Sequence, residues 1–284
     1  MIWILSALGV LVFLRAAYVT ATYLLYWYEA AQEGFLMVRE AGPMWVAALR
    51  ALVGYLFEIC ASVLVLLAYP ACVFVRDRPG PPGEKRPLLL VHGMHVNGGA
   101  LFLLKRRLAA AGWTSIYLLD LDFRRGHIAA LSDQVIARVE EILVATGADR
   151  VDALGHSLGG VVIFHTLLRG GGEHSLGTCL ALGAPFHGTR MANFSSSPLL
   201  RQFAPGSPML GDLCAKLEAP GAVSSLTRLV SIWSNYDNVV LPNTSAVLPS
   251  PPAENIRVDF VGHVSMLFSA TVARQVERVL AGSI

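Results

Sequence analysis

Hydrophobic positions along the chain fall into two patterns, and the first occupies the N-terminal quarter. Residues 2–27 and 51–75 are nearly uninterrupted apolar runs, and the charged side chain in each is Arg15 and Glu58, respectively. A helix needs about 20 apolar residues to cross a hydrocarbon core. We therefore predict a transmembrane helical hairpin over residues 1–75, with two buried helices of a soluble bundle as the alternative.

The polar stretch 29–40 is the expected turn of this hairpin, and the midpoint between Arg15 and Glu58 falls inside it. Charges in lipid usually find partners, so we expect these two side chains to pair at one depth. Two unrelated charges that face water or a partner are the alternative. Basic residues are more frequent just after the second run than in the turn, which favours a cytoplasmic position for the C-terminal part.

Beyond the hairpin, short apolar runs alternate with runs of helical spacing. Residues 76–87 are rich in proline and glycine and are a predicted linker, and residues 88–284 are the size of one domain. This alternation predicts an α/β fold with a mostly parallel sheet of about six strands and helices on both faces. The expected strands are residues 88–91, 115–121, 150–154, 176–182, 228–234 and 255–261, and the expected helices are 100–111, 128–145, 158–168 and 264–280.

Composition agrees with this division and removes several function classes. Of the 284 residues, 54% are hydrophobic and 15% are charged, against about 25% charged residues in an average soluble domain. The net charge of +2 gives no basic stripe for nucleic acid, so we expect no nucleic-acid partner. The 4 cysteines are too few for a disulfide scaffold and lack metal-ligand spacing. We expect no metal and no cofactor.

The strongest chemical motif is Gly155-His156-Ser157-Leu158-Gly159, between an expected strand and an apolar helix. A strand that turns into a helix within a few residues leaves the serine strained, with its hydroxyl exposed. Glycines are needed on both sides because larger side chains would clash across the turn. The helix N-terminus adds free amide groups and a positive dipole end beside the hydroxyl. The motif therefore predicts a nucleophilic serine.

This motif and two others resemble the alpha/beta-hydrolase fold, and within it the bacterial lipases and esterases. Residues 90–94, L-V-H-G-M, resemble the oxyanion strand of lipases, and residues 183–189, G-A-P-F-H-G-T, resemble a G-T-P-H-x-G-T segment of that family. The resemblance covers nearly all of residues 87–284 and leaves out residues 1–75. It implies a serine hydrolase that acts on carboxylic ester bonds.

In this fold the nucleophile, the acid and the histidine follow one another along the chain. His263 lies after the last expected strand, so it is the expected base for Ser157. Asp237 follows residues 228–234 and is the expected acid, although it could also be a turn aspartate that caps this strand. Two other carboxylates are weaker candidates, since Asp212 lies in an irregular stretch and Asp259 lies inside an expected strand.

The expected mechanism uses these three side chains and two backbone amides. His263 takes the proton of Ser157 as it attacks the ester carbonyl, and Asp237 holds the histidine tautomer. The amides of Met94 and Leu158 are expected to form the oxyanion hole. Water then hydrolyses the acyl-enzyme.

The remaining histidines have structural interpretations. We expect His92 to make a loop hydrogen bond, His156 to point away from the substrate side, and His187 to brace a loop. His95 and His127 have no acidic cluster beside them in the sequence, so we propose no metal site there.

Residues 189–227 lack a sheet pattern and carry apolar residues broken by prolines, so we expect a lid, or alternatively an ordinary cap. An apolar lid and a membrane anchor favour a lipase or phospholipase acting on membrane lipids or fatty acyl esters. A thioesterase or an acyltransferase would use the same triad, and a non-catalytic membrane scaffold with a hydrolase-like domain is the alternative from another class. The expected location is the bacterial inner membrane, with the catalytic domain on the cytoplasmic side.

Overall fold

The structure is a computed structural model that describes residues 2–32, 42–70, 76–80, 85–169, 175–221, 223–249 and 253–282. Its centre is a six-stranded sheet with the order β2-β1-β3-β4-β5-β6, in which every neighbouring pair is parallel. The strands are β1 (Leu88–Val91), β2 (Ile116–Leu119), β3 (Val151–His156), β4 (Leu176–Leu182), β5 (Arg228–Ser234) and β6 (Glu254–Val258).

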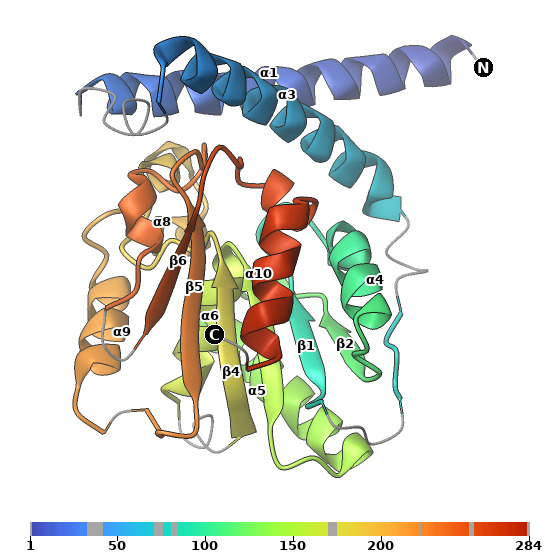
Figure 1. Ribbon diagram of the computed structural model, residues 1–284, viewed down its shortest axis with the longest axis vertical. Helices are drawn as coiled ribbons and strands as arrows, with labels where there is room; N and C mark the ends of the chain where they lie inside the picture. The colour runs from blue at the N-terminus through green and yellow to red at the C-terminus, as the bar shows by residue number, and fades with distance from the viewer. Residues whose placement is uncertain are drawn as a thin grey trace.

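Helices cover both faces of this sheet, as Figure 1 shows. The cluster on one face joins Leu89 and Val91 to the helices α5 and α6, and the cluster on the other joins Leu88 and Leu90 to α4 and α10. A strand buried on both sides must be apolar at every position, which explains the uninterrupted run in β1. These helices are α4 (Phe102–Ala110), α5 (Ile128–Thr146), α6 (Leu158–Leu167) and α10 (Ala270–Leu280).

The expected elements are present, with differences at their ends. The strands β4 and β5 have the predicted bounds, whereas β6 ends at Val258, before the predicted residue 261. The helix expected over residues 264–280 is interrupted, because the side chain of Ser269 accepts a hydrogen bond from the amide of Val272 and starts α10 as a new helix. The expected helix 100–111 begins with the short 3-10 helix η2 (Gly98–Leu101).

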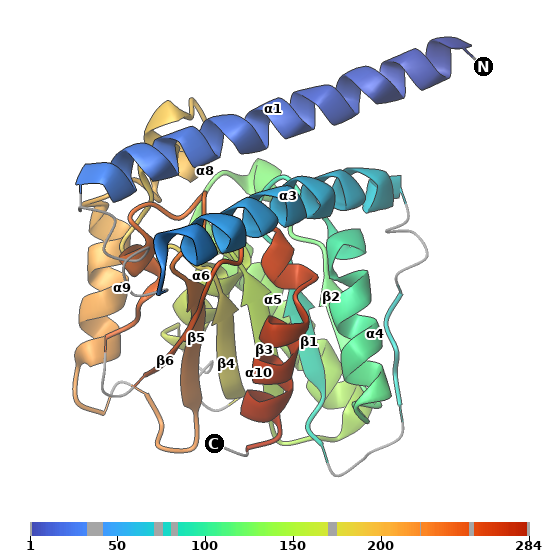
Figure 2. The same cartoon turned by 45° about the horizontal axis from the view of Figure 1, so that its top comes forward.

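The two N-terminal helices, α1 (Ile2–Gln32) and α3 (Met44–Ala68), lie across the carboxyl ends of the strands, beside the loops that follow β1, β5 and β6 (Figures 1 and 2). Both are long and apolar enough to cross a membrane by length and composition, with mean hydropathy 1.7 for Leu8–Gln32 and 2.3 for Met44–Ala68. The N-terminal part of α1 extends past the domain in Figure 2. The first residues of the expected turn 29–40 belong to α1, which continues to Gln32. The rest of this turn lies outside the described residues.

One face of α3 packs on the domain, and the opposite face is exposed. The buried residues recur every three or four positions, which is the period of one helix face. Gly54 is required there, because a Cβ atom would lie 2.5 Å from the carbonyl oxygen of Phe260. The buried set is Ala47, Gly54, Glu58, Ala61, Ser62 and Val65, and the exposed large apolar residues of α3 are Met44, Trp45, Leu49, Leu52, Val53, Leu56, Leu64 and Leu67.

Three further segments are the predicted linker, the stretch 189–227 and the turn before α10. Within the predicted linker, Arg78 forms an isolated antiparallel bridge with Ile116 at the free edge of β2. The stretch 189–227 contains the 3-10 helix η4 (Arg190–Phe194) and the helices α8 (Pro198–Arg201) and α9 (Pro208–Glu218). A further 3-10 helix, η6 (Ser265–Leu267), precedes α10.

Candidate active site

Ser157 occupies the sharp turn between β3 and α6. Its backbone φ is 55° and ψ is −125°, in the left-handed half of conformational space that a serine rarely adopts. A Cβ atom on Gly155 would lie 2.4 Å from the carbonyl carbon of Gly159, and a Cβ atom on Gly159 would lie 2.5 Å from the carbonyl oxygen of His92. The glycine spacing in the motif therefore allows the strained turn that the sequence predicts.

Asp237 and His263 form a short hydrogen-bonded pair at the ends of β5 and β6. The ring Nδ1 of His263 donates to Oδ2 of Asp237 at 2.7 Å, and both side chains are buried. The other carboxylate oxygen, Oδ1, accepts the amides of Val239 and Val240 at 2.8 Å each. Asp237 thus caps its own turn and also bonds to the ring of His263.

The other two candidate acids lie at the surface. Asp212 forms an ion pair with Lys216 one turn along α9, and Asp259 forms one with Arg257 just beyond the end of β6. Both carboxylates are more than half exposed, and neither bonds to His263.

The environment of His263 sets its protonation. Burial alone would lower the pKa of His263, but the carboxylate of Asp237 and, more weakly, that of Glu58 outweigh burial and raise this pKa above its ordinary value. The neighbouring His156 behaves in the opposite way, because burial and the charge of His263 lower the pKa of His156 to about 3. His156 is therefore neutral beside a histidine that gains a proton more readily.

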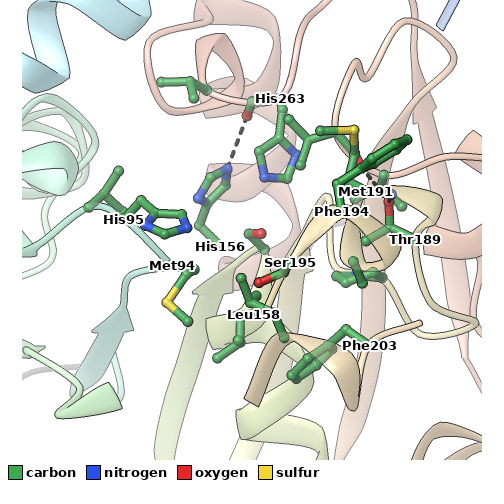
Figure 3. A pocket seen from close by; sticks show the side chains of 18 of the residues that line it. Met94, His95, His156, Leu158, Thr189, Met191, Phe194, Ser195, Phe203 and His263 are labelled. Carbon is green, nitrogen blue, oxygen red and sulfur yellow. Dashed lines mark hydrogen bonds between the residues drawn. The ribbon is translucent and has the colours of Figure 1, made fainter. Parts of the chain in front are cut away.

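Ser157 and His263 line one cavity of about 520 Å³, together with the two expected oxyanion residues, Met94 and Leu158. The cavity and several of its side chains are drawn in Figure 3. A Cβ atom on Gly93 would lie only 2.8 Å from Cβ of Ser157, so the loop after β1 passes directly against the serine. The hydroxyl of Ser157 makes no hydrogen bond to the described residues. A hydrogen bond between a catalytic serine and its base is often long or poorly aligned when no substrate is bound.

The structure corrects our interpretation of His156. Its side chain lines the same cavity as Ser157 and lies beside His263, as Figure 3 shows, rather than pointing away from the substrate side. Its Nε2 donates a hydrogen bond of 3.0 Å to the carbonyl oxygen of His263, and the two rings are 4.7 Å apart. A neutral ring in this position holds the backbone of His263.

Contacts from α3 correct our expectation that Glu58 pairs with Arg15. The two oxygens of Glu58 accept the backbone amides of Val264 and Ser265 at 2.8 and 2.7 Å, directly after His263 in the chain. Arg15 instead lines the cavity of Ser157. The sequence carried no signal for this, because the partners of Glu58 are backbone amides about two hundred residues away.

Helix α1 and the first turn of the Asp237 loop are joined as well. Thr22 accepts a hydrogen bond of 2.6 Å from the side chain of Asn238, whose oxygen accepts the amide of His263 at 3.1 Å. The hydroxyl of Tyr26 donates to the carbonyl oxygen of Asn235 at 2.9 Å. The hairpin therefore contacts both the loop of Asp237 and the loop of His263.

The stretch expected to form a lid contributes to both the cavity and the core. Met191, Phe194 and Phe203 line the cavity and are labelled in Figure 3, whereas Leu210 and Leu213 belong to the core cluster beneath it. The wall of the cavity on this side is therefore apolar, and part of the same stretch is packed into the hydrophobic core.

Two other histidines lie where their structural interpretations place them. Nδ1 of His92 is 2.8 Å from the carbonyl oxygen of Gly93 in the loop after β1, and Nε2 of His187 is 3.1 Å from the carbonyl oxygen of Val247. Within the described part of the chain, no group of three or more His, Cys, Asp and Glu side chains could hold a metal ion.

Comparison with solved structures identifies the fold. The chain is similar to Bacillus licheniformis lipase BlEst2 in its mature form, with a TM-score of 0.61 and 17% identity over 70% of this chain and 94% of that one. It is also similar to Aspergillus fumigatus lipase B, with a TM-score of 0.58 and 19% identity over 69% of this chain and 52% of that one. This chain thus corresponds to about half of the Aspergillus enzyme.

A protein from Listeria innocua matches at a TM-score of 0.54 and 15% identity, over 69% of this chain and 94% of that one. No family model matches the sequence. The sheet order, the serine turn and these similarities show that the chain has the alpha/beta-hydrolase fold, the fold of lipases and esterases.

Proposed function

We propose that this protein is a membrane-attached serine hydrolase that cleaves carboxylic esters of lipids through an acyl-enzyme. The observation that carries the proposal is the 2.7 Å pair between Asp237 and His263, which shares a cavity with Ser157 in its strained turn. A buried acid, a histidine and an exposed serine hydroxyl in this chain order are the parts that acyl transfer requires.

The proposed reaction begins at the free nitrogen of His263. Because Nδ1 faces Asp237, Nε2 is free to take the proton of Ser157 as the serine oxygen bonds to the ester carbonyl carbon. The amides of Met94 and Leu158 stabilise the oxyanion, and its collapse expels the alcohol, which takes the proton back from His263. His263 then deprotonates a water that attacks the acyl-enzyme. When this second oxyanion collapses, the carboxylic acid leaves and the oxygen of Ser157 takes the proton back from His263.

The apolar cavity wall supports an acyl chain as the part of the substrate next to the ester. Met191, Phe194 and Phe203 offer a surface that would bury methylene groups, each worth about 0.8 kcal/mol. Thioesters share the acyl-enzyme step, and an acyltransferase would pass the acyl group to an alcohol instead of water.

A fluorophosphonate probe tests the serine directly. We expect the purified protein to be labelled at Ser157, and S157A to lose both labelling and turnover of nitrophenyl esters while its circular dichroism is unchanged. Ser195 lines the same cavity and serves as the matched control, since S195A should keep both properties. Labelling that persists in S157A would contradict the proposal.

Nitrophenyl esters of graded chain length would separate a lipase from a short-chain esterase. Product analysis with an added alcohol would separate hydrolysis from acyl transfer.

The outer face of the hairpin supports attachment to a bilayer. Large apolar side chains cover that face of α3, whereas its inner face packs on the domain. A helix with lipid on all sides would have to give up the contacts of Gly54 and Glu58 with the catalytic loops. We therefore propose that the hairpin enters the membrane with its outer face while its inner face stays docked. The full chain should float with liposomes in a density gradient.

The side of the membrane is proposed from the basic residues around the linker. Arg76, Arg78, Lys85 and Arg86 follow the second apolar run, which favours the cytoplasmic face. Protease added to intact spheroplasts should then leave the catalytic domain uncut, and cleavage would place it on the opposite face.

A further inference from the structure

Arg15 is the permanently charged cation among the described residues that line the cavity of Ser157. It comes from α1, outside the part of the chain that resembles hydrolases, and it lines the same cavity as Ser157 and His263. Among the described residues that line this cavity, no aspartate or glutamate is present to balance the charge. Burial and the charge of Arg15 lower the pKa of His95, and His156 is neutral, so these two rings add no second cation.

Among the described residues, no carboxylate forms an ion pair with the guanidinium of Arg15. Its Nε is buried and has no hydrogen-bond partner within this described part of the chain. The guanidinium lies over the ring of Tyr18, whose centroid is 5.4 Å from Cζ of Arg15. A buried donor without a partner costs free energy, and a charged group costs more. An arginine on an apolar helix that faces a cavity therefore indicates an anionic ligand in that cavity.

We propose that Arg15 binds the phosphodiester of a glycerophospholipid whose acyl ester lies at Ser157. The proposal rests on the proposed function and names its substrate class. A planar guanidinium presents paired N–H donors that match two phosphate oxygens, which an ammonium group cannot do. In a glycerophospholipid only the glycerol backbone separates the phosphate from the esters, so one cavity of about 520 Å³ can hold both groups. The hairpin would thus select the substrate as well as attach the protein.

The test compares two monomeric substrates that differ in the phosphate. Dihexanoyl phosphatidylglycerol and dihexanoyl glycerol carry the same acyl chains and dissolve without a bilayer, so membrane attachment does not enter the comparison. We expect the wild-type protein to prefer the phospholipid in kcat/KM. R15Q should lower this preference at least tenfold, mainly through KM, and R15K should retain part of it.

Arg50 provides the matched control, because it is an exposed cation on the same hairpin and does not line the cavity. R50Q should leave the preference unchanged. An equal loss in R50Q, or a preference that survives in R15Q and R15K, would overturn the proposal. Free phosphate that stimulated hydrolysis of dihexanoyl glycerol would show that phosphate binds as a separate ligand, which would also overturn it. Loss of fluorophosphonate labelling at Ser157 in the wild-type protein would instead contradict the proposed function.

Discussion

In the catalytic domain the strands bury apolar residues on both faces, whereas the helix α3 buries Glu58, Ser62 and Gly54 and exposes leucines. The domain is thus arranged like a soluble protein, whereas α3 buries polar groups beside small apolar residues and exposes most of its large apolar side chains. The buried polar groups of the hairpin bond to the loops of Asp237 and His263. The comparison teaches that a segment outside the hydrolase-like region helps to build the site.

Another difference lies in what each region supplies. Hydrogen bonds within the catalytic domain fix Asp237 against His263 and the amides of its own turn. The hairpin supplies acceptors to backbone amides, at Glu58, and a donor to a backbone carbonyl, at Tyr26. Loss of a contact within the domain should therefore abolish turnover. Loss of a contact from the hairpin should displace His263 and only lower kcat. Four predictions test this difference, beginning with the largest effect.

The largest effect is expected for D237N. An amide in place of this carboxylate favours the wrong tautomer of His263 and no longer stabilises the imidazolium, so kcat should fall by about 10³–10⁴-fold. Turnover of a nitrophenyl ester measures this. D259N and D212N make the same change at exposed carboxylates and should leave kcat within about twofold of the wild-type value. A large loss in D259N would move the acid to that residue.

A smaller loss is expected for E58Q, which turns one acceptor of two backbone amides into a donor. The unpaired amide after His263 should lower the free energy of unfolding by about 1–3 kcal/mol and lower kcat by roughly ten- to a hundredfold through misplacement of the base. Chemical denaturation and ester turnover measure the two effects. Ser62 is buried one turn along α3 and has no hydrogen-bond partner in the described part of the chain, so S62A should be neutral. Wild-type kcat in a destabilised E58Q would show that Glu58 acts on stability alone.

The pH dependence of turnover separates the two carboxylates further. Protonated His263 cannot act as a base, so kcat/KM should fall as the pH drops through the pKa of His263, which lies above its ordinary value of 6.5. Both oxygens of Glu58 accept hydrogen bonds from backbone amides, as an ionised carboxylate does. The negative charge of Glu58 raises the pKa of His263. In E58Q the acid limb should therefore move to lower pH. An unshifted limb would show that Glu58 acts without its charge.

The smallest effect on turnover is expected on the outer face of α3. Leu52 and Leu56 are about half exposed and are not among the residues that line the cavity, so L52Q/L56Q should change the free energy of unfolding by no more than about 0.5 kcal/mol per residue. Turnover of a soluble ester should stay at the wild-type level, while flotation with liposomes should fall about tenfold or more because two apolar side chains leave the bilayer. Unchanged flotation would remove this face as the site of attachment.

The elements of the catalytic domain could be predicted from local patterns. The run 88–91 is apolar at each position because both faces of β1 are covered, and Gly155 and Gly159 surround Ser157 because the turn leaves no room for a Cβ atom. Asp237 could be expected from its place after a strand. Its pairing with His263 depends on the parallel order of β5 and β6, which brings the two strand ends together.

The hairpin was less predictable, because its important contacts are with distant backbone. The apolar pattern gave two helices, but the helix expected over 264–280 begins with a separate 3-10 turn whose amides at Val264 and Ser265 are satisfied by Glu58. A carboxylate in an apolar run was interpreted as a partner for Arg15. His156 was placed on the wrong side for a similar reason, since only the packing of the last loop shows which way its ring points.

The sequence by itself determined which residues must be buried, where the chain must turn, and that one serine stands between a strand and a helix. Those properties follow from hydrophobicity and backbone sterics, which act on neighbours in the chain. The tertiary structure alone decided that Arg15 faces the cavity and that Glu58 holds the histidine loop. Such contacts join residues about two hundred positions apart, and their energy depends on the fit of two surfaces that no local pattern encodes.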